Sequence, residues 1–142
     1  MLNKLSHMGG MEKEFRHRPV FRFEKLDIWQ ETRALNRLIY EWTRSFPSEE
    51  AFGLTSQLRR ASVSISSNIA EGSGRNSDAD FCRFLEIAFG SLMEMVSQAF
   101  LANDEAYLSD ESHHELMTRA DSLSRTLADL IRSLGRNPRS KQ

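Results

Sequence analysis

The sequence is poor in residues that interrupt helices and in residues that form cross-links. Its 142 residues include three prolines, seven glycines and one cysteine. The single Cys82 excludes an internal disulfide and any multi-cysteine metal site, and it fits the reducing cytoplasm. With 39% hydrophobic and 27% charged residues, this composition favours a helical globular protein over a disordered or β-rich one.

A strong charge of one sign and long apolar runs are also missing. The 19 lysines and arginines nearly balance the 20 acidic residues, for a formal net charge of −1. The chain therefore lacks the global basic field that would by itself indicate a nucleic-acid-binding protein. No apolar run approaches the roughly 18 residues of a membrane span, and the N-terminus lacks the hydrophobic stretch of a secretory signal. We expect a cytoplasmic protein that does not contact a membrane.

The chain length fits one domain. Residues 1–21 have little apolar periodicity and a Gly-Gly pair, which predicts a flexible N-terminal tail. Residues 22–135 have the pattern of a folded helical domain, and residues 136–142 are expected to form a C-terminal tail.

Apolar residues at three-to-four spacing predict two helices in the first half of the domain. The first begins near Phe23 and stops at Pro47. The second begins with Ser48 as N-cap and acidic residues in its first turn, where carboxylates favour the helix dipole. It is expected to end at Gly72 and Gly74, because glycine tolerates the left-handed conformation of a C-terminal cap.

The stretch SVSIS inside this second segment alternates like a half-buried strand. The longer row favours a helix, because the apolar residues around it step by four, three and four: Leu54, Leu58, Ala61 and Ile65. Small residues also recur every four positions, at Ser62, Ser66 and Ala70. This spacing predicts a face that a neighbouring helix approaches closely.

Two further helices are predicted in the second half. Ser77, with Asp80 three residues on, resembles a capping box. An unbroken four-three row follows it: Phe81, Leu85, Ala88, Leu92, Met95, Ala99 and Ala102. Ser109 caps the last helix, which repeats the same spacing and is expected to end at Gly135.

Four long helices with short connections predict an all-α, up-down-up-down antiparallel four-helix bundle. The apolar stripes are wider than one seam needs, because Phe84, Phe89, Val96 and Phe100 lie beside the main row of the third helix. This extra width indicates a second buried surface between subunits, so we expect a homo-oligomer.

Three segments together resemble the bacterial 23S ribosomal RNA intervening-sequence proteins: FEKLDIWQ, FGLTSQLRRASVSISSNIAEGSGR and FCRFLEIAFGSLMEM. The resemblance covers about residues 23–135. It implies up-down-up-down bundles that assemble into ring-like homopentamers, most of them without an established activity. Relatives that serve as accessory proteins of diversity-generating retroelements bind nucleic acid through basic side chains, which makes RNA or DNA an expected partner class.

Basic residues of the second helix and the turn after it are the candidate nucleic-acid-binding residues: Arg59, Arg60, Arg75 and Arg83. They could form a basic rim on one side of the bundle, and a ring would repeat that rim with its symmetry. The alternative is that these arginines pair with Glu71, Glu86 or a neighbouring subunit's carboxylate.

A second set consists of polar residues at helical spacing in otherwise apolar or small segments: Asn68, Glu71, Glu94 and Gln98. We interpret them as a structural polar network between two helices that fixes their register. Catalysis is the alternative, but two carboxylates alone lack a base, nucleophile or cofactor partner that would complete a mechanism.

Metal and cofactor sites are not predicted. A di-metal bundle needs two Glu-x-x-His motifs, and the chain offers one, Glu111 to His114. The GSGR turn lacks the preceding strand and the lysine of a phosphate loop. We therefore expect no catalytic residues, no metal and no cofactor. The favoured function is a non-enzymatic homo-oligomeric helical bundle, pentameric by resemblance, that acts as a binding module, with RNA or DNA at a basic rim as a candidate partner. The alternative is a protein–protein scaffold without nucleic-acid binding.

Overall fold

The computed structural model describes residues 18–139, which contain four long helices and no strand. The α-helices are α2 (Asp27–Thr43), α3 (Leu54–Ser73), α4 (Asp78–Asp104) and α5 (Asp110–Arg139), and two 3₁₀ turns, η1 (Arg22–Lys25) and η2 (Ser48–Glu50), precede α2 and α3. The all-α prediction is confirmed. The predicted N-terminal tail lies outside the described residues except for residues 18–21, and so do residues 140–142 of the predicted C-terminal tail.

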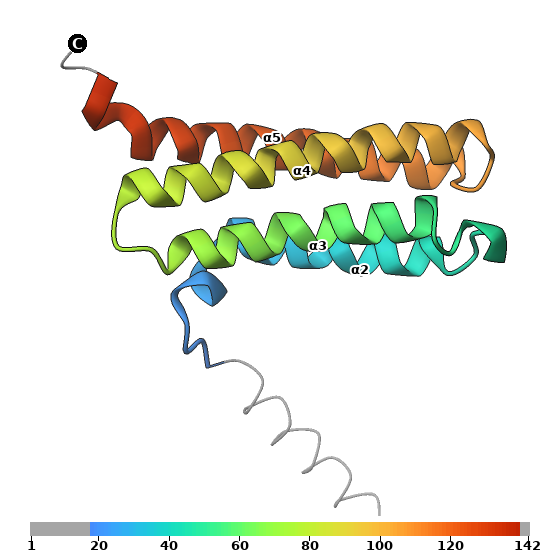
Figure 1. The fold of residues 1–142 in the computed structure, drawn as a ribbon, viewed down its shortest axis with the longest axis horizontal. Helices are drawn as coiled ribbons and strands as arrows, with labels where there is room; N and C mark the ends of the chain where they lie inside the picture. Colours follow the sequence, from blue (N-terminus) through green and yellow to red (C-terminus); the bar gives the residue numbers. More distant parts are fainter. Residues whose placement is uncertain (1–17, 140–142) are drawn as a thin grey trace, which may run out of the picture.

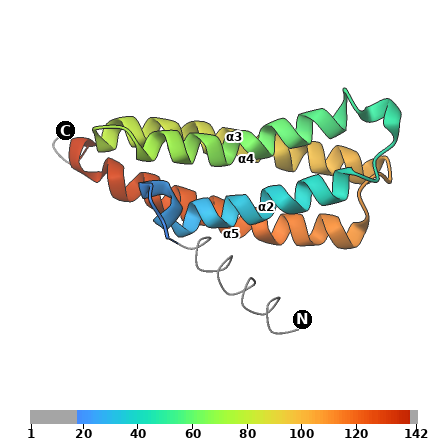
Figure 2. The same cartoon turned by 90° about the horizontal axis from the view of Figure 1, so that it is seen from below.

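The four helices lie side by side, joined by short connections (Figure 1). Helix α3 packs against α4, α4 against α5, and α2 against both α3 and α5. Viewed from below, α2 and α3 lie nearest the viewer, with α5 and α4 beyond them (Figure 2). Each helix therefore has two neighbours, an inner face and an outer face.

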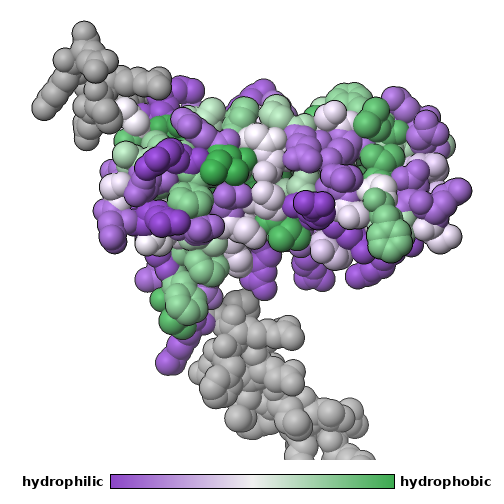
Figure 3. Space-filling model, viewed as in Figure 1, coloured by the Kyte–Doolittle hydropathy of each residue, from purple (hydrophilic) through white to green (hydrophobic). Residues whose placement is uncertain are grey.

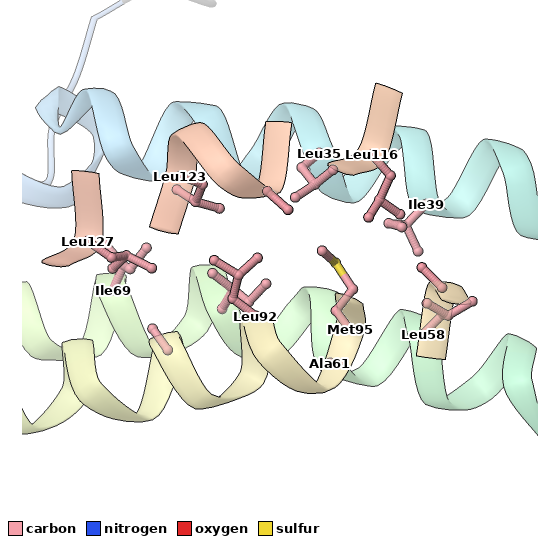
Figure 4. Packing of buried hydrophobic residues seen from close by; sticks show 14 of the residues in the cluster. Leu35, Ile39, Leu58, Ala61, Ile69, Leu92, Met95, Leu116, Leu123 and Leu127 are labelled. Carbon is pink, nitrogen blue, oxygen red and sulfur yellow. The ribbon is translucent and has the colours of Figure 1, made fainter. Parts of the chain in front are cut away.

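The core is built from the predicted apolar rows. Leu35, Leu92, Met95, Leu116 and Leu127 are at most 2% exposed, and their side chains point toward one another from the different helices (Figure 4). Full burial of one such side chain contributes about 1.5–3 kcal/mol. The seven residues of the predicted row on α4 are the seven buried residues of that helix.

Two predicted N-caps are present as expected. The Ser77 hydroxyl accepts a hydrogen bond from the backbone N–H of Asp80 at 3.1 Å. The Ser109 hydroxyl accepts one from the N–H of Ser112 at 3.1 Å. Each serine satisfies one backbone donor that the first turn of a helix leaves unpaired.

The start of α3 differs from the prediction. Ser48 opens only the short turn η2, and α3 begins at Leu54. The backbone leaves the helical conformation at Gly53 (φ −106°, ψ −119°), a residue type that weakens a helix by about 1 kcal/mol relative to alanine. The Glu50 carboxylate accepts a hydrogen bond from the Leu54 N–H at 3.0 Å and so replaces the expected serine cap.

Helix α3 ends at Ser73 with Gly74 as its C-cap, where the end was predicted. The conformation of this cap and the end of α5 differ from the prediction. No glycine in residues 18–139 has a positive φ, and Gly74 caps α3 at φ −88°. Gly72 lies inside α3, where an added Cβ would meet the Phe84 Cβ at 2.7 Å, so close packing rather than a left-handed cap explains this glycine. Helix α5 continues past Gly135 to Arg139, because Gly135 keeps a helical backbone.

The sequence analysis expected no apolar segment of membrane-spanning length, and α4 shows that this expectation was wrong. This helix is long and apolar enough to cross a membrane by length and composition, a test that the core helix of a soluble protein also passes. Only 28% of its most apolar window is buried inside the chain. Four large apolar side chains of α4 are exposed: Ile87, Met93, Phe100 and Leu101.

Candidate functional site

The first half of α3 presents two of the candidate arginines, Arg59 and Arg60. Arg59 is half-buried, its Nε donates a hydrogen bond to the Thr43 hydroxyl at 2.9 Å, and its guanidinium lies over the Tyr40 ring at 4.6 Å. The Thr43 hydroxyl in turn donates to the Ile39 carbonyl at 2.6 Å. Helix α2 thus orients Arg59, while Arg60 is exposed.

The other two candidates, Arg75 and Arg83, lie at the opposite end of α3. Arg75 pairs with Glu71 at 3.2 Å and lies over the Phe84 ring at 4.7 Å. Arg83 pairs with Asp80 rather than with Glu86. Helix α3 continues for 14 residues after Arg59 and ends at Ser73, a rise of about 21 Å at 1.5 Å per residue, and Arg75 lies beyond that end. The structure therefore does not bring the four arginines together in a single rim.

Arg59 and Arg60 line a shallow groove of about 780 Å³. Tyr40 from α2, Phe52 from the turn before α3, and Glu94 from α4 also line it. Phe52 is 97% exposed, the highest value among the large apolar side chains described. The groove thus combines two cations with a free aromatic ring, beside one carboxylate.

The predicted polar network does not form between the helices. Each member bonds within its own helix instead. Asn68 donates to the Ser64 carbonyl at 2.8 Å, Glu71 is the partner of Arg75, and Gln98 donates to Glu94 at 3.1 Å. Residues four positions apart are neighbours on the surface of one helix, so such polar side chains can bond there without reaching a second helix.

Smaller polar groups make the contacts between helices. The hydroxyls of Ser64 on α3 and Ser91 on α4 lie 2.8 Å apart. The buried Ser62 donates to the Asn36 side-chain oxygen of α2 at 3.0 Å. Short hydroxyl side chains fit where helices approach closely, and together with the Arg59–Thr43 hydrogen bond they join α3 to its neighbours.

Three basic residues that the sequence analysis did not single out lie on the outer face of α2. Arg33, Arg37 and Arg44 are exposed, and Tyr40 lies among them. Their positions follow the i, i+4, i+7, i+11 spacing that places residues on one side of a helix. The apolar stripe of α2 drew attention to its inner face, and the same count applied to its cations would have found this outer row.

A second apolar row on α4 lies beside the buried one. It consists of Phe89, Met93, Val96 and Phe100, again at four-three-four spacing. Met93 is 43% exposed and Phe100 47% exposed, while the other two are half-buried. Phe100 meets the His113 ring of α5 edge-on at 4.7 Å, so this row lies on the flank of α4 toward α5. We call it the outer α4 row.

The surface formed by α3 and α4 is mixed in character. Apolar residues lie among small and polar ones across both helices (Figure 3). Ile87 and Leu101 of α4, which do not belong to the outer α4 row, are more than half exposed. The exposed apolar area of α4 therefore extends beyond the outer α4 row.

The ionisable side chains of residues 18–139 include no group that could hold a metal ion. Within residues 18–139 no three histidine, cysteine or acidic side chains are placed to hold a metal ion, and Glu111 and His114 have no further ligand beside them. Burial, followed by the charges of Glu86 and Asp78, raises the pKa of the Cys82 thiol. A raised pKa lowers the thiolate fraction, which disfavours a nucleophilic role.

Comparison with known proteins gives a family and a fold. The family profile for the 23S rRNA-intervening sequence protein matches residues 24–129. The crystal structure of a protein of unknown function from the S23 ribosomal protein family of Bacteroides thetaiotaomicron is 21% identical, with a TM-score of 0.66, and covers 73% of this chain and 97% of that chain. This likeness shows the fold alone. No curated protein matches the chain.

Proposed function

The chain belongs to the 23S rRNA-intervening sequence protein family, and from that premise we propose that it acts in the cytoplasm without catalysis, as a homo-oligomeric helical bundle that binds a partner. In this proposal the four helices form an up-down-up-down bundle, and five copies assemble into a ring. The ring size rests on the family resemblance.

The outer α4 row is the observation that supports assembly. Nearly half of the surface of Met93 and of Phe100 is exposed to water. Burial of this apolar area by a neighbouring copy would contribute about 25 cal/mol of free energy for each Å² covered. Heptad-like spacing is the pattern by which one helix packs along another. A second copy that lies along α4 would bury both residues.

The test is the mass of the assembled protein in solution, measured by light scattering or native mass spectrometry. We expect the wild-type chain to form an oligomer and the Met93→Glu, Phe100→Glu double variant to dissociate into monomers with unchanged helix content. Phe21, which is 61% exposed and lies outside α4, supplies the control, because Phe21→Glu should keep the wild-type mass. A wild-type monomer at micromolar concentration would refute the assembly.

A second candidate function, a nucleic-acid-binding accessory module, is favoured by a different observation. Among the residues that the structure describes, the arginines of α2 and of the first half of α3 form no ion pair with a carboxylate. The single basic rim expected from Arg59, Arg60, Arg75 and Arg83 does not describe this surface, because Arg75 and Arg83 are paired at the other end of α3.

A further inference from the structure

The charges of the described surface are divided between two sides of the molecule. Three of its five ion pairs lie along α5, where Arg119, Arg125 and Arg132 each pair with an acidic residue three or four positions earlier. The other two lie at the end of α3 and the start of α4. Helix α2 contributes no ion pair within residues 18–139.

The unpaired cations of α2 form a straight row. From Arg33, the helix rises about 6 Å to Arg37 and about 10 Å more to Arg44. Arg59 of α3 joins this row at Tyr40, whose ring lies under its guanidinium. We call Arg33, Arg37, Arg44 and Arg59 the α2 stripe.

Two members of the α2 stripe are held in place by aromatic rings. Arg33 lies over the Trp29 ring at 5.6 Å, and Arg59 lies over the Tyr40 ring at 4.6 Å. An arginine that is already oriented loses less side-chain entropy when it binds an anion. Within residues 18–139 Arg59 donates only its Nε, which leaves its two terminal nitrogens as hydrogen-bond donors for an anion.

The surroundings of the α2 stripe decide what it binds. A hollow of about 200 Å³ lies between Arg37, Tyr40 and Arg44, and Glu41 is the one carboxylate that lines it. At the Arg59 end the surface continues into the larger groove, which holds the almost fully exposed Phe52. A row of cations that ends at a free aromatic ring has the two parts of a single-strand-binding surface, a track for phosphates and a ring for base stacking.

We propose that the α2 stripe binds the sugar–phosphate backbone of single-stranded RNA or DNA and that a base stacks on Phe52. An acidic protein segment would use the arginines but would leave Phe52 without a stacking partner, so the geometry favours nucleic acid. The inference rests on the second candidate function and replaces its predicted rim with a different face. Exposed arginines on one helix face contact phosphates and not base edges, so we expect the protein to bind oligonucleotides with low sequence preference.

The experiment compares two variants that remove the same charge. One carries Arg33→Gln, Arg37→Gln and Arg44→Gln, and the control carries Arg119→Gln, Arg125→Gln and Arg132→Gln on α5. Binding of a fluorescently labelled 20-nucleotide polyuridylate is measured by anisotropy at several salt concentrations. We expect the α2 variant to lose at least about tenfold in affinity and its salt slope to fall by about two, since each lost single-strand phosphate contact removes about 0.7 from the slope. The α5 variant should bind within about twofold of wild type, because its arginines are already neutralised by their partners.

Two single variants test the details. Glu41→Gln removes the one carboxylate of the smaller hollow and should strengthen binding. Phe52→Ala should weaken it about fivefold or more, because stacking one base on an aromatic ring contributes roughly 1–3 kcal/mol. Unchanged binding in Phe52→Ala would refute the stacking part of the proposal.

Three results would overturn the whole inference. Equal losses in the α2 and α5 variants would show that net charge, and not the α2 stripe, holds the oligonucleotide. Binding of labelled polyglutamate with no binding of polyuridylate would identify an acidic protein partner. Dissociation of the α2 variant into monomers would show that the stripe joins copies. The mass of every sample is measured in parallel, so a monomer that binds polyuridylate refutes the proposed ring and leaves the α2 stripe intact.

Discussion

Two glycines of similar local conformation should respond in opposite ways to replacement by alanine. Gly72 of α3 and Gly90 of α4 both lie inside helices, where alanine is favoured by about 1 kcal/mol on propensity alone. Their surroundings differ. A Cβ at Gly72 would meet the Phe84 Cβ at 2.7 Å and the Phe81 ring at 2.8 Å, while a Cβ at Gly90 has nothing within 4 Å.

The steric cost at Gly72 should exceed the gain in propensity. Relief of a 2.7 Å contact with a Cβ requires α3 and α4 to move apart, because that atom cannot rotate away. Overpacking of this kind costs about 2–3 kcal/mol, so Gly72→Ala should destabilise the fold by a net 1–2 kcal/mol or so. Gly90→Ala should stabilise it by about 1 kcal/mol.

Thermal unfolding followed by circular dichroism measures both variants, with the assembled mass recorded at the same protein concentration. A change of 1 kcal/mol corresponds to about 4 °C in Tm for a domain of this size, so the two variants should differ by roughly 8–12 °C. If Gly72→Ala were as stable as Gly90→Ala, the close approach of α3 to α4 at Phe84 would be refuted.

Three further predictions follow from individual contacts. Ser62→Leu should lower the free energy of unfolding by about 1–3 kcal/mol, because the buried serine touches α2 through Asn36, and an unchanged urea midpoint would contradict this. Hydrogen bonds from the backbone N–H groups of Phe21 and Val20 lower the pKa of Glu24. The stability that the Glu24 carboxylate gives to the N-terminal turn is therefore fully present above the usual carboxyl pKa and is lost as the pH falls through the lowered pKa. Amide exchange in residues 20–25 should rise at that lower pH, and Glu24→Gln should exchange fast at every pH. Because partial burial raises the pKa of Cys82, iodoacetamide should modify it more slowly at pH 8 than it modifies a free cysteine, and equal rates would argue against the shielded thiol.

Local signals predicted the helices well. The caps at Ser77 and Ser109 depend on atoms within three residues, and the buried row of α4 depends on a period that the helix geometry fixes. The break at Gly53 was missed because the Glu50 carboxylate, not the predicted Ser48, caps α3. Periodicity alone does not decide whether two helical turns join into one helix.

The candidate site was predicted less well, because long polar side chains choose among several partners. Arg59 reaches Thr43 on another helix, whereas Arg75 finds Glu71 four residues earlier on its own. Sequence spacing can predict a pair four residues apart, such as Arg75 with Glu71, but not a pair between two helices, such as Arg59 with Thr43. Asn68 and Gln98 also bond locally, which explains why the predicted network between helices does not form.

Whole-chain charge is a poor guide to what this surface binds. A net charge of −1 argued against a nucleic-acid-binding protein, yet that sum weighs every charge equally. An ion pair with its members within 4 Å looks nearly neutral beyond the Debye length of about 8–10 Å at physiological salt. The paired arginines of α5 therefore project little field, while the unpaired Arg33, Arg37 and Arg44 project theirs into solvent. Among residues 18–139, several cations without a carboxylate partner lie on α2 and the adjoining part of α3. A slightly acidic chain can therefore present one basic face, and affinity measured across that face should depend on salt far more steeply than the net charge implies.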